Sequence, residues 1–120
     1  MLVNVDYKES VAICRYHETK MSNLEHSHLR DTVEKLYDTN VKLIAMDLSK
    51  VTYIGSPGIG ALISINDYCI KLQEKFEDEV YKFVIFGLNS TNTTLFKMLR
   101  IDTFIKITNN EEEAIEYLNS

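Results

Sequence analysis

The residues with the clearest chemical potential lie in the segment Met46–Leu62, MDLSKVTYIGSPGIGAL. In its second half, Ser56 is followed at once by Pro57 and then by two glycines. Serine is a preferred N-cap because its side-chain oxygen accepts hydrogen bonds from amides two and three residues later, and proline suits the first helical position. We therefore expect a helix with Ser56 as its N-cap, displaying the serine hydroxyl at the positive end of the helix dipole.

The two glycines, Gly58 and Gly60, fall in the first turns of that expected helix. Because glycine has no side chain, another surface or a phosphate group can approach the backbone there. They do not form a nucleotide-binding P-loop, since the lysine that follows the last glycine of that motif is absent and position 61 is alanine. The segment predicts a displayed hydroxyl rather than a nucleotide site.

Other residues that could catalyse a reaction or bind a metal lack suitable partners. His17, His26 and His28 have no Asp, Glu or Cys at spacings typical of a metal site. Cys14 and Cys69 are far apart in the sequence, and we interpret them as buried free thiols. We expect no metal, no cofactor and no enzymatic activity.

Asp47 leaves one enzymatic alternative open. It ends an apolar segment typical of a central strand, which is how receiver domains present their phospho-acceptor aspartate. Such domains also need an acidic pair after the first strand to bind magnesium, and here only Asp6 is available. We interpret Asp47 instead as a structural residue that accepts backbone N–H bonds in the turn Leu48–Val51. A receiver that forms an acyl phosphate on Asp47 remains an alternative hypothesis.

The elements that must position these residues alternate between strands and helices. Strands are predicted by apolar or alternating segments at residues 2–6, 11–16, 41–48, 81–88 and 104–107. Helices are predicted by apolar periodicity at residues 24–38, 56–76, 95–99 (after a loop at 89–94) and 109–118. This alternation implies parallel pairing with right-handed crossovers. We expect one α/β domain over residues 1–120, in the order ββαβαβαβα, with a mixed sheet packed by helices.

The predicted helix from residue 56 carries two apolar stripes. The first, at alternating three- and four-residue steps, consists of Leu62, Ile65, Cys69, Leu72 and Phe76. The second consists of Ile59, Ile63, Asn66 and Ile70. One stripe is enough to dock a helix on a sheet. The second either widens the buried face or leaves Ile59 and Ile63 partly exposed as a docking patch close to Ser56.

Composition excludes several classes of protein. A length of 120 residues with 45% hydrophobic content is typical of a single globular domain. No apolar segment is long enough to cross a bilayer, and the N-terminal residues lack the layout of a signal peptide, so we expect a cytoplasmic protein without direct membrane insertion. A net charge of −5 argues against nucleic acid as a partner, because such binding depends on Lys and Arg contacts to phosphate.

The segment around Ser56 resembles the signature of the STAS family, the anti-sigma factor antagonist domains of bacteria. That signature consists of a strand ending in Asp-Leu-Ser, an apolar step, and Asp-Ser-Ser-Gly-Leu-Gly at the start of a helix. The matching residues are Asp47, Leu48 and Ser49, then Val51, Tyr53 and Ile54, then Gly58, Ile59 and Gly60. Ser56 falls at the phosphorylatable serine of the family, but Gly55 replaces the aspartate before it and Pro57 replaces the second serine.

The resemblance extends over roughly residues 8–118. Asn89 follows a strand as in the family, and residues 99–104 (LRIDTF) stand where the family often has a Gly-Leu-Asp-like step. Residues 113–115 (EAI) then open the last helix.

This resemblance implies a non-enzymatic signalling module that takes part in transcription regulation. The unphosphorylated form would bind an anti-sigma factor, which is a serine protein kinase, and so free a sigma factor. That kinase would use ATP to phosphorylate Ser56 and end the interaction, and a phosphatase would reverse the modification. The implied contact surface is residues 53–63, in particular Tyr53, Gly55, Ser56, Pro57, Gly58, Ile59 and Ile63, with Asn89 adjacent.

The two departures from the signature favour an alternative function. Without the aspartate and the second serine, Ser56 could serve only as a helix cap. The chain would then be a STAS adaptor subunit of a signalling scaffold or of a transporter complex. Its binding would ignore charge at Ser56 and depend on apolar side chains such as Ile59, Ile63 or Phe96.

Overall fold

A computed structural model of the chain describes residues 3–21 and 26–120. The beginning of the helix predicted from residue 24 and the side chain of His26 lie outside this description.

A five-stranded mixed sheet forms the centre of the molecule. Its strands are β1 (Val3–Lys8), β2 (Val11–Tyr16), β4 (Leu43–Asp47), β6 (Lys82–Phe86) and β7 (Lys106–Thr108). They lie in the order β1-β2-β4-β6-β7, with β1 and β2 antiparallel and every other pair parallel. The continuous apolar segments of β4 and β6 occupy the central positions because a strand covered on both faces must be apolar on both.

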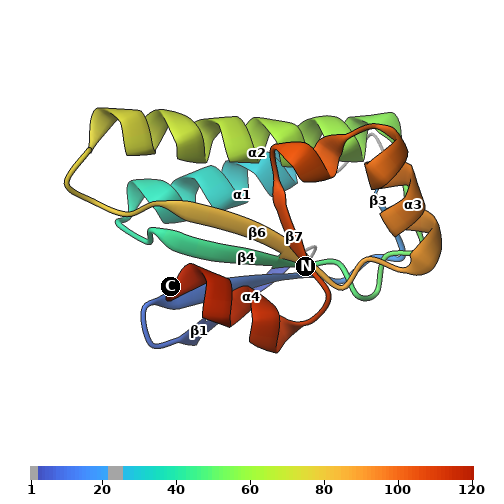
Figure 1. The fold of residues 1–120 in the computed structure, drawn as a ribbon, viewed down its shortest axis with the longest axis horizontal. Coiled ribbons are helices and arrows are strands. Elements are labelled where there is room, and N and C mark those ends of the chain that lie inside the picture. Colours follow the sequence, from blue (N-terminus) through green and yellow to red (C-terminus); the bar gives the residue numbers. More distant parts are fainter. Residues whose placement is uncertain (1–2, 22–25) are drawn as a thin grey trace.

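Helices cover both faces of the sheet (Figure 1). The helices α1 (His26–Asp38) and α2 (Ser56–Lys75) lie side by side on one face, and α4 (Glu111–Leu118) lies on the other. The larger core lies between the sheet and the helix pair, and a smaller core joins Ala114 and Leu118 of α4 to apolar residues of β2, β4 and β6. The predicted α/β fold, a mixed sheet packed by helices, is confirmed.

Three short elements add to the predicted order. Two-residue strands β3 (Lys20–Met21) and β5 (Tyr53–Ile54) pair in parallel, and a 3-10 turn, η1 (Ile101–Thr103), precedes β7. The prediction of β7 at 104–107 was therefore early by two residues at its start, because Phe104 ends the turn η1.

The helix α3 (Ser90–Met98) begins earlier than the sequence predicted. Residues 89–94 were expected to form a loop, but the Asn89 side chain accepts a hydrogen bond from the amide of Asn92 and starts the helix at once. An asparagine N-cap supplies an acceptor for one of the amides that have no partner within the helix.

The two stripes of α2 differ in burial. Leu62, Ile65 and Cys69 of the first stripe are buried against the main core, as predicted, but Phe76 lies beyond the end of α2 and is 41% exposed. In the second stripe Ile59 and Ile63 are half-buried and pack against the edge of the same core. The second stripe thus widens the buried face and still leaves part of both isoleucines accessible near Ser56.

Substitution by alanine should change the free energy of unfolding in opposite directions at the two glycines near the start of α2. A Cβ at Gly58 would lie 2.8 Å from Met21 Cβ and 3.1 Å from Ile54 Cγ2, whereas a Cβ at Gly60 would meet no atom within 4 Å. We expect Gly58→Ala to lower the free energy of unfolding by about 1–3 kcal/mol through overpacking. Gly60→Ala should raise it by about 0.5–1 kcal/mol because alanine favours the helix.

Urea denaturation followed by circular dichroism measures both changes. Each variant serves as the control for the other, since both replace a glycine within one turn of the same helix. Equal effects at the two positions would contradict the packing described here.

Candidate functional site

Ser56 is the first helical residue of α2, and Gly55 is the N-cap. The prediction that Ser56 caps the helix was therefore wrong. Gly55 takes the extended conformation of an N-cap, donates its N–H to Met21 O at 3.2 Å and accepts the N–H of Ile59 at 3.0 Å. Because the cap position is occupied by the residue before it, the Ser56 side chain is left exposed at the helix end.

The first turn of α2 offers few free backbone donors. The first amides of a helix have no carbonyl one turn earlier to bind, and Pro57 has no amide hydrogen. The amide of Ile59 is already bonded to Gly55 O. The amides of Ser56 and Gly58 are therefore the ones available to an anion carried by the serine.

Gly55 needs no special conformation. Its φ of −83° suits any residue, and a Cβ there would lie in ordinary contact, 3.4 Å from Tyr53 Cε2 and 3.5 Å from Met21 O. The ring of Tyr53, which is 58% exposed, lies beside the position where an aspartate of the family signature would carry its side chain. The absence of a carboxylate at Gly55 is thus a difference in chemistry rather than in backbone shape.

The N-terminal end of α3 lies beside the segment that leads from β4 to β5 (Figure 1). Asn89 Nδ2 donates to Thr52 O at 3.4 Å, and Asn92 Nδ2 donates to Val51 O at the same distance. Both contacts tie α3 to the segment that leads into Ser56. The structure therefore places Asn89 at the same end of the molecule as the serine, and its part in partner binding stays a prediction.

We call the accessible part of this end the Ser56 surface: Tyr53, Ser56, Pro57, Ile59, Gly60 and Ile63, each exposed or half-exposed. Gly55 and Gly58 were predicted to belong to the contact surface but are buried beneath it. Gly58 permits the close packing of α2 on Met21, so its role is to position the serine. Gly60 was not singled out for contact, yet its exposure leaves the backbone open beside Ser56.

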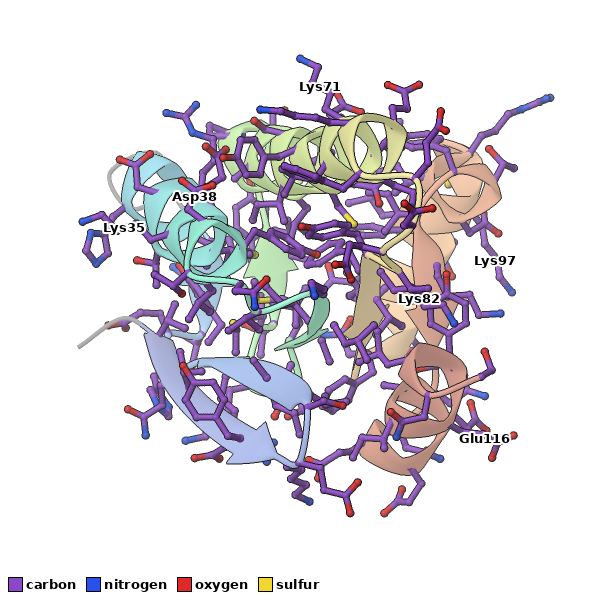
Figure 2. All side chains as sticks on the ribbon, turned by 90° about the vertical axis from the view of Figure 1, so that its left-hand side faces the viewer. Lys35, Asp38, Lys71, Lys82, Lys97 and Glu116 are labelled. Carbon is purple, nitrogen blue, oxygen red and sulfur yellow. The ribbon has the colours of Figure 1, made fainter. Side chains whose placement is uncertain are left out.

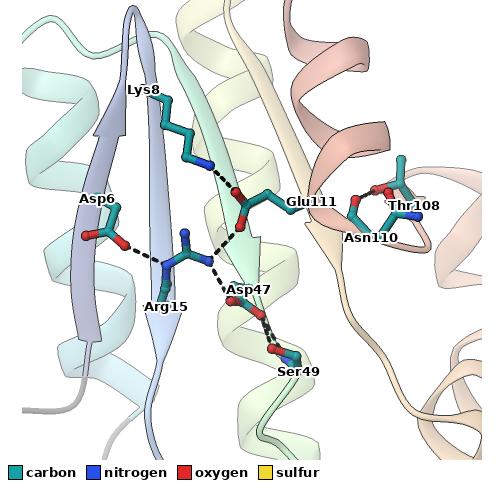
Figure 3. A network of polar contacts seen from close by, with 8 residues as sticks. All are labelled: Asp6, Lys8, Arg15, Asp47, Ser49, Thr108, Asn110 and Glu111. Atoms are coloured by element: carbon teal, nitrogen blue, oxygen red, sulfur yellow. Dashed lines mark hydrogen bonds and ion pairs between the residues drawn. The ribbon is translucent and has the colours of Figure 1, made fainter.

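Asp47 belongs to a network of polar contacts at the end of β4 (Figure 3). Its Oδ1 accepts the Ser49 amide at 2.9 Å, which confirms the predicted role in the turn that follows the strand. Its Oδ2 accepts a hydrogen bond from Arg15 Nη1 at 2.9 Å. The same Nη1 donates to Glu111 Oε1 at 2.8 Å, and Arg15 Nε donates to Asp6 Oδ2 at 2.6 Å.

This network argues against Asp47 as a phospho-acceptor. The residue is 8% exposed and both carboxylate oxygens are engaged. Asp6 is directed to Arg15 rather than to a metal position. The partner Arg15, and Glu111 that binds the same arginine, were not predicted from the sequence; the signal was an arginine within the otherwise apolar strand segment VAICRY.

The described residues hold no group of three or more His, Cys, Asp or Glu side chains that could bind a metal ion. Cys14 and Cys69 are buried free thiols, as predicted, and burial raises the pKa of Cys14 to about 12. In the same part of the chain, every helix is too short or too polar to cross a membrane.

Comparison with known families assigns the fold. The model of the STAS domain matches residues 9–114. The chain belongs to the STAS domain family.

Solved structures share this STAS fold at low sequence identity. TM1081 of Thermotoga maritima, described as a candidate anti-sigma factor antagonist, is 20% identical and has a TM-score of 0.76, covering 98% of this chain and 95% of that chain. An anti-sigma factor antagonist from Mycobacterium paratuberculosis is 12% identical, with a TM-score of 0.78 and coverage of 98% and 93%. The phosphorylated form of the Bacillus cell fate determinant SpoIIAA is 12% identical, with a TM-score of 0.69 and coverage of 97% and 98%.

The polar network predicts how the stability of this STAS domain depends on pH. Hydrogen bonds from Lys8 and Arg15 lower the pKa of the Glu111 carboxyl below its ordinary value. A carboxylate with a depressed pKa stabilises the fold above its unfolded pKa, and this contribution is lost as the pH falls through the folded pKa. We expect the wild type to lose more stability than Glu111→Gln between about pH 5 and pH 3.

Urea denaturation at several pH values measures this difference. Glu112→Gln is the matched control, because Glu112 is the exposed neighbour of Glu111 in the first turn of α4. The control should lose as much stability as the wild type when the pH is lowered. If Glu111→Gln loses as much as well, the carboxylate of Glu111 does not stabilise the fold through this network.

Proposed function

We propose that this STAS domain is an anti-sigma factor antagonist: a non-enzymatic module that binds an anti-sigma factor with serine kinase activity and is released when Ser56 is phosphorylated. The observation that carries the proposal is the exposed Ser56 hydroxyl at the start of α2, next to the half-buried Ile59 and Ile63. A modifiable hydroxyl and an apolar contact patch thus share one surface. Membership of the STAS family and the fold shared with anti-sigma factor antagonists support it.

The proposed step is a phosphoryl transfer from ATP. The Ser56 oxygen attacks the γ-phosphorus, its proton passes to a base of the kinase, and ADP leaves. A phosphatase uses water to return Ser56 to the hydroxyl form and releases inorganic phosphate. Ser56 is accessible for both reactions because its side chain is exposed.

A phosphoryl group on Ser56 should change binding more than fold. It carries a charge of about −1.5 to −2, which the helix dipole and the amides of Ser56 and Gly58 partly stabilise. The group points away from the core, so the domain has no need to rearrange. A partner packed over Ile59 and Ile63 would instead bury an unpaired dianion, which costs several kcal/mol, about 2–7 even for a neutral polar group.

Two forms of SpoIIAA support this separation of fold from binding. The structure of its unphosphorylated form matches this chain with a TM-score of 0.71, and the phosphorylated form matches with 0.69. Both forms of that protein therefore keep the fold described here.

Two residues favour a second candidate, an adaptor that binds without switching. Gly55 supplies no carboxylate beside the serine, and Pro57 supplies no amide to a phosphoryl group. In an adaptor subunit of a signalling scaffold or transporter complex, Ile59 and Ile63 would supply the contact. A charge at Ser56 would then leave partner binding unchanged.

Charge at Ser56 distinguishes the two candidates. We expect Ser56→Ala to capture a serine kinase of the anti-sigma type from lysate of the native host, and Ser56→Glu to lose it, because glutamate places a negative charge against the partner. Ser10→Glu is the control, since Ser10 is also exposed but lies in the turn between β1 and β2. Mass spectrometry identifies the captured proteins. If all variants retain the same scaffold or transporter subunits, the domain is an adaptor.

An aspartate at position 55 tests whether the missing carboxylate slows the phosphorylation of Ser56. Gly55→Asp is sterically tolerated, and we expect the captured kinase to phosphorylate Ser56 faster in this variant. It should also stabilise the domain by a few tenths of a kcal/mol, roughly 0.3, because aspartate is a better N-cap than glycine.

Gly55→Asn separates these two effects, because it caps the helix without a charge. Radiolabelled phosphate incorporation measures the phosphorylation rates, and thermal unfolding measures stability. A rate equal to wild type in the aspartate variant would show that the missing carboxylate does not limit phosphorylation.

A further inference from the structure

The end of α3 carries exposed apolar and basic side chains together. Met98 is 76% exposed and Leu99 is 51% exposed, and Lys97 and Arg100 on either side of them are also exposed. We call these four residues the basic end. The Lys97 side chain points out into solvent (Figure 2).

Arg100 holds a backbone conformation that is unfavourable for any residue with a Cβ. Its backbone is left-handed, with φ 60° and ψ 25°, directly after the last turn of α3. Glycine is the residue best suited to such a helix end, because it has no Cβ to clash in this region. Arg100 therefore carries a backbone cost at the end of α3, as the exposed Glu9 with φ 60° does in the turn between β1 and β2.

The loop between α2 and β6 carries the opposite charge with similar apolar exposure. Phe76 is 41% exposed, Val80 is 55% exposed, and Glu77 and Asp78 between them are exposed. We call these four residues the acidic end. Phe76, Glu77 and Asp78 border a hollow of about 420 Å³ that Glu74, Lys75 and Glu79 also line.

The two ends lie at opposite extremes of the long axis of the molecule (Figure 1). In the part of the chain that the structure describes, none of the charges of Lys97, Arg100, Glu77 and Asp78 takes part in an ion pair. The opposite charges close in sequence are Asp102 near the basic end, and Lys75 and Lys82 near the acidic end. Lys75 Nζ lies 5.3 Å from the centre of the Phe76 ring, and Lys42 pairs with Glu79 of the same loop. Each end therefore presents unneutralised charge beside two exposed apolar side chains.

We propose that the basic end of one copy docks on the acidic end of a second copy, so that the domain associates head to tail. The guanidinium of Arg100 and the ammonium of Lys97 would face the carboxylates of Glu77 and Asp78, and Met98 and Leu99 would cover Phe76 and Val80. A symmetric contact between two basic ends would instead place like charges together. Because the contact joins two different surfaces, each bound pair leaves one basic end and one acidic end free, and the association extends into chains.

This association does not depend on the proposed function, because it involves neither phosphorylation nor an anti-sigma factor. Few side chains take part, so the contact is weak and is measured at high protein concentration. We expect the weight-average mass in sedimentation equilibrium to rise with concentration up to about 1 mM. A mass that stays at that of the monomer over this range would overturn the proposal.

Charge reversal tests which surfaces meet. Arg100→Glu and Asp78→Arg should each lower the association constant about fivefold or more, because each places like charges across the contact. An equal mixture of the two variants should recover association, since the intact basic end of one meets the intact acidic end of the other. Failure of the mixture to recover would overturn the head-to-tail arrangement.

Two further variants serve as controls. Glu116→Arg makes the same change of net charge as Asp78→Arg on the exposed face of α4 (Figure 2), and it should leave the association constant within about twofold of wild type. Arg100→Gly should raise the melting temperature by relieving the left-handed conformation and yet weaken association. If Glu116→Arg weakens association as much as Asp78→Arg, or if Arg100→Gly leaves association unchanged, the assigned surfaces are wrong.

Discussion

The close packing of the first turn of α2 against Met21 determines how this molecule presents its serine. Met21 is 1% exposed and lies in the short strand β3, which pairs with β5 immediately before the helix. The carbonyl of Met21 accepts the Gly55 amide, and its Cβ would be only 2.8 Å from a side chain at Gly58. A glycine at 58 is therefore required for the helix to reach this position, and Ser56 is turned outward as a result.

A second set of contacts fixes the segment that precedes this packing. Asp47 holds the Ser49 amide and is itself held by Arg15, so the end of β4 and the turn after it are fixed by charge as well as by burial. On the other side, Gly87 adopts φ +86° and approaches Ser49 so closely that a Cβ there would lie 3.0 Å from Ser49 Cβ. The segment between β4 and Ser56 is thus fixed at its start by the polar contacts of Asp47 and at its end by packing against Met21.

The sequence predicted the large elements well because their signals are local. Continuous apolar segments identified β4 and β6, and three- and four-residue periodicity identified α1, α2 and α4. The errors concern features that depend on contacts distant in the chain. The pairing of β3 with β5 joins residues 20–21 to 53–54, and this pairing places the extended residue at Gly55 and makes it the N-cap in place of Ser56. The partner of Asp47, Arg15, is likewise 32 residues away from it in sequence, and Glu111, which also accepts from Arg15, is 96 residues away from the arginine.

In the proposed function, binding and its control share one surface, and modification leaves the fold unchanged. The most direct test is to purify the domain from its native host under phosphatase inhibition, separate the partner-bound pool from the free pool, and locate phosphate in each by fragment mass spectrometry. The account predicts phosphate on Ser56 in the free pool and an unmodified Ser56 in the bound pool. Phosphate on Ser56 at equal levels in both pools, or a free pool in which Ser56 is never phosphorylated, would contradict it.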